Sequence, residues 1–267
     1  MSITKKGIAI LASVVLALSL VLIGGTSCNF SREVKLIKEG TLIIGSDCDY
    51  PPFVEMAGSK PVGFEVDLME AIGELLGLKI EYLPPQNFDT LIATVAAGGI
   101  CDIGVSSFTI TRDRQKEVNF CIPYFDSNQA IVTLKTKNIT NYSQLAGMTI
   151  GVQSGTTGEE WALENIPNAT IKPFNQTTEA VYALVAGDID AAVYDEPVAK
   201  EHVNGQWTQC EIAQIIATGE QYGIAVPKNN RGLRDAINQA LRDLKTNGTF
   251  DRIFAEYFPG VDPPAIR

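Results

Sequence analysis

The sequence predicts an α/β fold made of two similar lobes, because the chain twice repeats the order strand, helix, strand, helix, strand. The two copies share a cadence. LIATVAAGGICDIGV at 91–105 and EAVYALVAGDIDAAV at 179–193 both run from an apolar helix through glycine to a strand that an aspartate leads. Alternation of strands and helices predicts, for each lobe, a mostly parallel sheet with helices packed on its faces.

The first copy begins with an apolar strand at 41–45, and the chain must turn soon afterwards because Pro51 and Pro52 cannot continue a strand. At 63–76 apolar side chains recur at steps of four, four and three, which predicts an amphipathic helix that Gly77 ends. A strand at 79–83, a helix at 88–97 and a third strand from Asp102 onward complete this copy.

The second copy has the same parts. We expect strands at 148–153, 170–173 and 189–194, and helices at 158–165 and 177–186. A further strand at 223–227 and helices at 231–246 and 249–258 follow, the last with an aromatic face.

The N-terminus has the layout of a secretory signal. Lys5 and Lys6 precede an uncharged stretch at 7–27 that ends in small residues directly before Cys28. We therefore expect a signal peptide at 1–27, a lipid on Cys28 and a tether at 28–40. Gly25 departs from the leucine that is usual three places before a lipidated cysteine, and an uncharged stretch of this length could instead remain as a membrane-spanning helix.

Charge and length narrow the classes of function. The 267 residues suffice for one large domain or two modest ones. The net charge is −10, and removing the two lysines of the signal from the 21 basic residues leaves 19 against 31 acidic ones. This balance argues against a nucleic-acid partner and mildly favours cationic solutes.

The remaining cysteines are Cys48, Cys101, Cys121 and Cys210. Outside the cytoplasm such a set can form disulfides, with three possible pairings that the sequence does not distinguish. The chain has no CxxC pair and a single histidine, His202, which argues against a zinc site. His202 lies in a polar stretch and is expected to be exposed, with no chemical role.

A cluster of hydroxyls follows the third strand of the first copy. Ligands of open α/β sheets bind beyond the carboxyl ends of the strands, which places Ser106, Ser107 and Thr109 at such a rim, with Arg114 close by. Arginine offers a charged fork for a carboxylate, and hydroxyls can either accept or donate. The alternative is an ordinary polar loop with a solvated arginine.

The second copy offers two further candidates. A loop of small residues at 153–159 joins a strand to a helix, and the free N–H groups at a helix start can bind an anion. The loop lacks the spacing of a nucleotide site, and Thr157 could simply cap the helix. Asp195 follows a strand and could bind an ammonium group, or it could cap the turn before Pro197.

Four motifs, in order, resemble the family 3 extracellular solute-binding proteins, the polar amino acid receptors of ABC importers. They are SDCDYPPF at 46–53 with GFEVDLMEAI at 63–72, then SSFTITRDR at 106–114, QSGTTGEE at 153–160 and YDEP at 194–197. The resemblance covers nearly all of the chain after residue 40. It implies the type II periplasmic-binding-protein fold, in which one lobe is inserted into the other and two strands form a hinge, here near 121–129 and 218–222. The lobes would be 41–124 with 221–267, and 125–220.

The resemblance also assigns roles to residues. It implies that Arg114 and the loop at 153–159 hold the α-carboxylate of an amino acid, and that Asp195 takes the ammonium. The other ligand-binding residues that we expect are Asp47, Tyr50, Phe88, Ser106, Ser107, Thr109, Gln153, Thr156 and Thr157. Aromatic residues at positions such as those of Tyr50 and Phe88 are more often core, but in the family they sandwich the ligand side chain. Asp47 would lie at its far end.

We therefore expect a monomeric extracytoplasmic receptor that captures a polar L-amino acid and delivers it to an ABC permease, held to the membrane only by its lipid. Asp47 between aromatic faces favours arginine or lysine, with glutamine second. No cofactor or metal is implied. One alternative is an enzyme that resembles cyclohexadienyl dehydratase, with Glu159 as the candidate general acid. The other is an extracytoplasmic sensor module.

Overall fold

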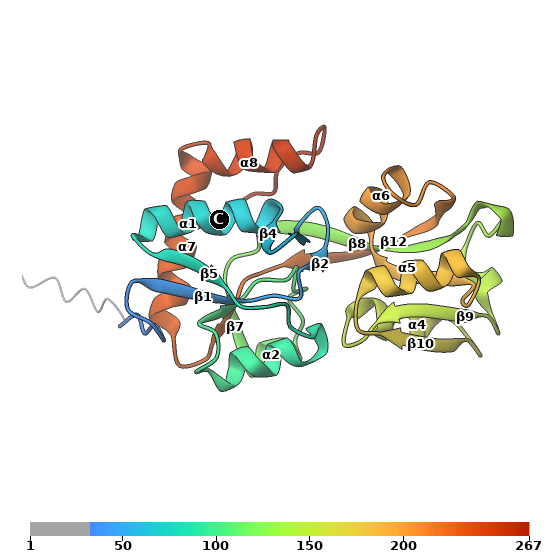
Figure 1. Ribbon diagram of the computed structural model, residues 1–267, viewed down its shortest axis with the longest axis horizontal. Helices are drawn as coiled ribbons and strands as arrows, with labels where there is room; N and C mark the ends of the chain where they lie inside the picture. Colours follow the sequence, from blue (N-terminus) through green and yellow to red (C-terminus); the bar gives the residue numbers. More distant parts are fainter. Residues whose placement is uncertain (1–32, 267) are drawn as a thin grey trace, which may run out of the picture. The chain divides into compact units, whose positions relative to one another are not determined.

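The structure is a computed structural model that describes residues 33–266 (Figure 1). These residues form two five-stranded sheets, each with its own helices, and one small three-stranded sheet. The expected signal peptide and Cys28 lie outside the described residues. None of the helices in this range is long and apolar enough to cross a membrane.

The first sheet has the strand order β5 (Lys79–Tyr82), β1 (Thr41–Gly45), β6 (Ile103–Gly104), β13 (Ala225–Pro227) and β7 (Val118–Phe120). Strand β1 is parallel to β5 and β6, whereas β13 is antiparallel to β6 and β7. Its helices are α1 (Phe64–Leu76), α2 (Phe88–Ala97), α3 (Arg114–Glu117), α7 (Arg231–Thr246) and α8 (Thr249–Tyr257). We call this sheet with its helices, together with the small three-stranded sheet, the first lobe.

Both faces of the first sheet are buried. Leu42 and Ile44 of β1 belong to the core that contains residues of α1 and α7, and Ile43 between them belongs to the core of α2. Successive side chains of a strand point to opposite faces, so an unbroken apolar run is what a sheet covered on both sides requires.

The second sheet has the order β10 (Thr170–Phe174), β9 (Thr149–Gln153), β11 (Ala191–Asp195), β8 (Phe125–Leu134) and β12 (Cys210–Tyr222). Strand β9 is parallel to β10 and β11, and β8 is antiparallel to β11 and β12. Its helices are α4 (Thr157–Asn165), α5 (Thr177–Ala186) and α6 (Glu196–Asn204), with short 3₁₀ turns at Lys135–Lys137 and Tyr142–Leu145. This is the second lobe.

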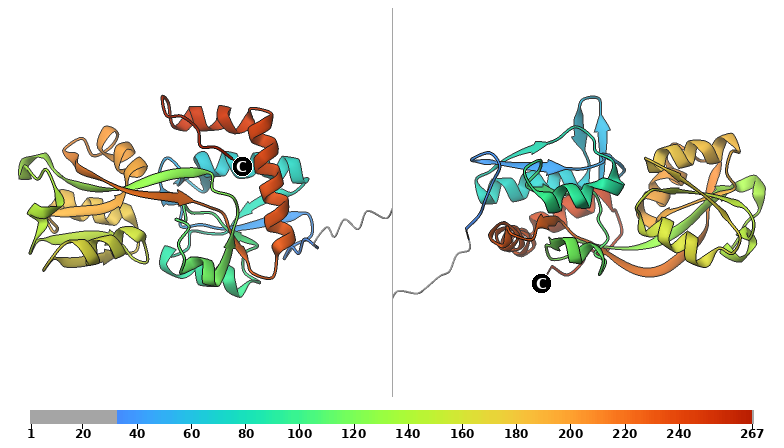
Figure 2. Two further views of the ribbon diagram at one scale, coloured as in Figure 1. Left: turned by 180° about the vertical axis from the view of Figure 1, so that it is seen from behind. Right: turned by 90° about the horizontal axis from the view of Figure 1, so that it is seen from below.

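Two antiparallel strands connect the lobes. Figure 1 and the left view of Figure 2 show β8 and β12 running side by side out of the second sheet. At their ends Tyr222 pairs with Phe125, and the backbone N–H of Tyr124 donates to the carbonyl of Tyr222 at 3.0 Å. Tyr222 also forms an isolated bridge with Thr109 of the first lobe. The expected two-strand connection is therefore present.

An aromatic cluster anchors this connection to the first lobe. Phe53 lies in the small sheet of β2 (Asp49–Tyr50), β3 (Val54–Ala57) and β4 (Lys60–Val62), in the turn between β2 and β3. Its ring centroid is 4.8 Å from that of Phe125, 5.3 Å from that of Tyr222 and 5.1 Å from that of Phe258. Fully buried aromatic pairs at these separations are favourable beyond their buried area, which fixes where the connecting strands start and end.

Most of the predicted helices and strands are confirmed, with ends that differ by one or two residues. The third strand of the first copy is shorter than expected, because only Ile103 and Gly104 pair as a strand before the chain enters the hydroxyl loop. The small sheet, α6 and most of the length of β8 and β12 were not predicted.

The prediction that His202 is exposed is wrong. It lies on α6, is 3% exposed and packs between Tyr194 and Trp207, with Nδ1 3.2 Å from the hydroxyl of Tyr194. Burial lowers the pKa of His202 to about 4, so the ring is neutral near pH 7. The unpredicted helix turns this side chain inward.

The four cysteines of the described residues are buried free thiols. None of the three possible disulfide pairings is therefore formed in this structure. Burial raises the pKa of Cys48 and of Cys101 to about 11, which keeps both protonated at neutral pH.

Candidate functional site

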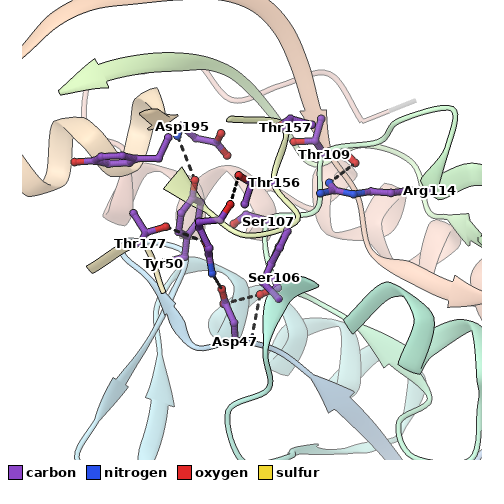
Figure 3. A pocket seen from close by; sticks show the side chains of 13 residues that line it. Asp47, Tyr50, Ser106, Ser107, Thr109, Arg114, Thr156, Thr157, Thr177 and Asp195 are labelled. Atoms are coloured by element: carbon purple, nitrogen blue, oxygen red, sulfur yellow. Dashed lines mark hydrogen bonds between the residues drawn. The ribbon is translucent and has the colours of Figure 1, made fainter. Parts of the chain in front are cut away.

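One cleft is lined by every ligand-binding residue that the sequence predicted (Figure 3). From the first lobe come Asp47, Tyr50, Phe88, Ser106, Ser107, Thr109 and Arg114, and from the second come Gln153, Thr156, Thr157 and Asp195. Thr177 and Tyr194, which we had not selected, also line it. Thr177 opens a helix after a strand and Tyr194 belongs to the YDEP motif, so the same reasoning on strand ends and helix starts could have found both.

Arg114 lies at one side of the cleft, at the start of α3. Its Nη1 donates to the carbonyl of Thr109 and its Nη2 to the carbonyl of Gly155 in the second lobe, both at 2.9 Å. The guanidinium carbon is 5.3 Å from the ring centroid of Phe88, which stacks on Phe108. Burial lowers the pKa of Arg114, but an arginine remains charged in proteins. The cation is thus fixed in place by an aromatic face and two carbonyls.

The hydroxyl loop is held from behind by buried carboxylates. Ser106 Oγ donates to Asp47 at 2.6 Å. Ser107 has a φ of +48°, which is uncommon for a residue with a side chain, and both its N–H and its hydroxyl donate to Glu65, at 2.7 and 3.0 Å. Glu65 is fully buried and also accepts from Tyr124, and burial raises its pKa to about 7. Glu65 is part of the GFEVDL stretch, and its support of the loop was not predicted.

Asp47 closes another side of the cleft. It is 3% exposed, and besides Ser106 it accepts from Nε2 of Gln153 at 3.0 Å. Gln153 is held in turn by Thr177, whose hydroxyl donates to its Oε1 at 2.9 Å. Burial raises the pKa of Asp47, while these hydrogen bonds oppose the rise. Figure 3 shows Asp47 and Ser106 together at a different side of the cleft from Arg114.

The loop before α4 corrects one detail of the sequence analysis. The residue that caps the helix is Thr156, whose hydroxyl oxygen accepts from the N–H of Glu159 at 3.1 Å and donates to the carbonyl of Gln153 at 2.7 Å. Thr157 is already the first helical residue, and its hydroxyl points elsewhere. Glu159, the candidate general acid, accepts from the N–H of Gly155 at 2.8 Å and is not among the residues that line the cleft.

Asp195 ends β11 and lies at the far side of the cleft from Asp47 in Figure 3. Its position is that of a helix cap, but its side chain makes no capping hydrogen bond. The carboxylate instead accepts from Gln129 and from the hydroxyl of Tyr222, and its backbone N–H donates to the hydroxyl of Tyr50 at 3.2 Å. Burial, followed by the nearby charge of Glu220, raises the pKa of Asp195 to about 7.

Glu220 is a neighbour of the site that the sequence analysis missed. It lies on β12, and its carboxylate accepts from the hydroxyls of Thr109 at 2.7 Å and of Thr157 at 2.8 Å, and from Nε2 of Gln129 at 3.0 Å. No local sequence signal marks it as a site residue, although it lies in the connecting strand that the resemblance implied near 218–222.

A comparison with known protein families shows to which family the chain belongs. Residues 42–260 match the family described as bacterial extracellular solute-binding proteins, family 3. The chain belongs to this family. The expected membership is thereby confirmed, and solute binding is the role of this chain at that level.

Relatives of this solute-binding protein agree in fold. It is 29% identical over 238 residues to the arginine-binding extracellular protein ArtP of Bacillus subtilis (strain 168), covering 88% of this chain and 92% of that protein. A solved ancestral arginine-binding protein bound to arginine superposes with a TM-score of 0.77 at 37% identity, covering 82% of this chain and 98% of the other. The fold is the two-lobed type II periplasmic-binding-protein fold, as predicted.

A third similar protein bears on the enzyme alternative. The ancestral amino acid-binding protein AncCDT-1, a precursor of cyclohexadienyl dehydratase, superposes with a TM-score of 0.76 at 33% identity, covering 82% of this chain and 96% of that one. All three of these similar proteins are named as binding proteins. In this solute-binding protein the cleft places a fixed cation and buried carboxylates at separate positions, an arrangement that complements a small molecule carrying charges of both signs.

Proposed function

We propose that the protein is an extracytoplasmic receptor that captures a polar L-amino acid in this cleft and delivers it to the permease of an ABC importer. The observation that carries the proposal is the placement of Arg114 and Asp195 in one cleft, on different lobes. A ligand with both a carboxylate and an ammonium group would contact both lobes at once. Its greater affinity for the arrangement in which the lobes meet would then shift the population toward that arrangement.

Each charged group of the ligand has a site. Arg114 would hold the α-carboxylate together with backbone N–H groups of the loop that leads from Gln153 through Thr156 and Thr157 into α4. Asp195 would take the α-ammonium, together with Ser107 and Thr109. Ser106 supports the hydroxyl loop after β6 through its hydrogen bond to Asp47.

The ligand side chain would lie between Tyr50 and Phe88 and reach toward Asp47. An acid at the end of an aromatic slot favours a cation or an amide over another carboxylate, so we propose arginine or lysine first and glutamine second. ArtP and the ancestral protein are named for arginine. Other similar proteins are named for cystine or histidine.

The location of the protein is part of the proposal. We propose that residues 1–27 are removed, that Cys28 carries the lipid, that the mature protein is a monomer, and that the lobes are 41–124 with 221–267, and 125–220. The family is described as extracellular, which supports secretion. Cys28→Ala should move the protein out of the membrane fraction or leave it uncleaved, and a mature N-terminus other than Cys28 would contradict the anchor.

Calorimetric titration of residues 29–267 with each of the common L-amino acids tests the receptor function. We expect saturable binding at about micromolar affinity, about −8 kcal/mol, with arginine or lysine tightest. Binding of none of them would reject the function. Turnover of prephenate or arogenate by the same sample would instead support the enzyme alternative, which the similarity to a dehydratase precursor keeps worth measuring.

A further inference from the structure

Glu220 lies where both lobes and the connecting strands meet. It belongs to β12, directly after a shift in the pairing register with β8 between Ile216 and Glu220. Its three donors come from three parts of the fold: Thr109 from the first lobe, Thr157 from the start of α4, and Gln129 from β8. The carboxylate is therefore held by the frame of the site rather than pointing freely into solvent.

The two threonine contacts fix which way each hydroxyl is polarised. A hydroxyl has a single hydrogen to donate, and an ionised carboxylate can only accept. The hydroxyls of Thr109 and Thr157, 2.7 and 2.8 Å from one oxygen of Glu220, therefore both donate to it. Toward the cleft, which both residues line, each hydroxyl can then only accept a hydrogen bond.

Asp195 lines the same side of the cleft as the Thr109 and Thr157 hydroxyls. Its carboxylate shares the donor Gln129 with Glu220, since the amide nitrogen of Gln129 contacts both acids. This shared donor fixes the positions of the two carboxylates relative to each other. This side of the cleft thus presents the oxygens of Asp195, Thr109 and Thr157 as acceptors, whereas Arg114 supplies fixed donors to the same cleft.

We propose that Glu220 is a positioning residue that sets the polarity of the Thr109 and Thr157 hydroxyls and thereby makes this side of the cleft select an ammonium group. The inference rests on the proposed function, because it specifies how the cleft recognises the α-amino group of the ligand. Glu220 acts through the two hydroxyls and need not touch the ligand. An analogue that lacks the amino group leaves the acceptors without donors, which a site of fixed polarity penalises strongly.

The test compares L-arginine with 5-guanidinopentanoic acid, which is the same molecule without the α-amino group, and L-glutamine with glutaramic acid as a second pair. Calorimetry gives the ratio of dissociation constants within each pair. In Glu220→Gln the amide can donate to the threonines and release their hydrogens toward the cleft. We expect L-arginine to bind at least about tenfold more weakly, the deaminated analogue to change by less than about twofold, and the ratio to fall accordingly.

The matched control is Glu211→Gln, which removes the same charge from the other end of β12 and contacts none of these groups, so its ratio should equal that of the wild type. Thr157→Val is the second variant, because it deletes one of the oriented hydroxyls and leaves Glu220 in place; it should lower the ratio as well. Equal losses for both members of a pair in Glu220→Gln, or an unchanged ratio, would overturn the inference while leaving the receptor function intact. A wild-type protein that binds no amino acid would reject the receptor function itself.

Discussion

Gln153 donates to Asp47 across the cleft, with its Nε2 3.0 Å from Oδ2 of the carboxylate. The hydrogen bond joins the end of β9 in the second lobe to the loop after β1 in the first. The Asp47 carboxylate therefore accepts from two side chains of the protein, Ser106 and Gln153, and still lines the cleft. A ligand side chain that reaches Asp47 meets an acid whose position is already fixed.

Asp47→Asn should change which ligand the protein prefers and should leave the fold intact. An anion at the end of the slot favours a cation, so we expect arginine and lysine to lose at least about tenfold in affinity, about 1.4 kcal/mol, and glutamine much less. Titration of both proteins with arginine and glutamine measures this. Glu55→Gln, the same loss of charge at an exposed position of β3, is the control. Equal losses for the two ligands would remove Asp47 from a specificity role.

Arg114→Ala should abolish binding of every amino acid ligand. A hydrogen bond to a charged group contributes about 1.5 to 3 kcal/mol, and a bidentate pair contributes more than a single bond. The matched variant is Arg112→Ala, which removes an exposed arginine from the same loop and should bind normally. Near-normal affinity in Arg114→Ala, with circular dichroism like that of the wild type, would show that the carboxylate binds elsewhere.

The parts of the fold that the sequence predicts are those with a strong local signal. Helices α2, α5 and α7 have the predicted limits, because their apolar residues recur at helical spacing and glycines or polar residues follow them. Strand β12 carries no such signal. Buried and exposed residues do not alternate along this strand, because two shifts in the pairing register interrupt it and it pairs only with β8. The strands of the small sheet have two to four residues and depend on tertiary packing around Phe53.

The candidate site divides in the same way. Residues that follow strands or open helices could be found, because the fold class fixes where strand ends lead. Glu65 and Glu220 could not, because each supports the site from an element whose approach to the cleft is set by long-range packing. Glu65 is on a helix far from Ser107 in sequence, and Glu220 comes from the return strand. The direction of the Thr156 and Thr157 hydroxyls was likewise decided by partners that only the folded chain brings near.

A contact between the lobes outside the cleft gives the third prediction. The carboxylate of Asp49 in β2 accepts from the N–H of Thr178 at 3.1 Å and from its hydroxyl at 2.7 Å, in the first turn of α5, where the helix dipole favours an anion. Asp49→Ala should weaken ligand binding by about three- to tenfold without altering which ligand is preferred. The contact that this change removes stabilises only the arrangement in which the lobes meet. Asp188→Asn, an exposed change in the second lobe, is the control. A change in the order of ligand preference would contradict this role.

The last prediction concerns pH and rests on Asp195. Its pKa in the folded protein is raised to about 7, by burial and then by the charge of Glu220, whereas an unfolded aspartate has a pKa near 3.8. Between these values the folded protein binds more protons than the unfolded chain, so this group makes the ligand-free protein less stable as pH rises from about 4 to about 7. Glu65, with a pKa raised to about 7, contributes in the same direction.

Ligand binding should respond in the opposite sense. An ammonium group binds the ionised form of Asp195, so binding displaces a proton below pH 7, and affinity should fall toward a limit of about tenfold per pH unit as the solution is acidified. Calorimetry at pH 5, 6, 7 and 8 measures the affinity, and the heat in buffers of different ionisation enthalpy counts the protons released. Asp195→Asn should bind weakly and with little pH dependence, while its ligand-free stability retains the part of the slope due to Glu65. An affinity that is constant from pH 5 to 8 would mean that Asp195 is not the group that meets the ammonium.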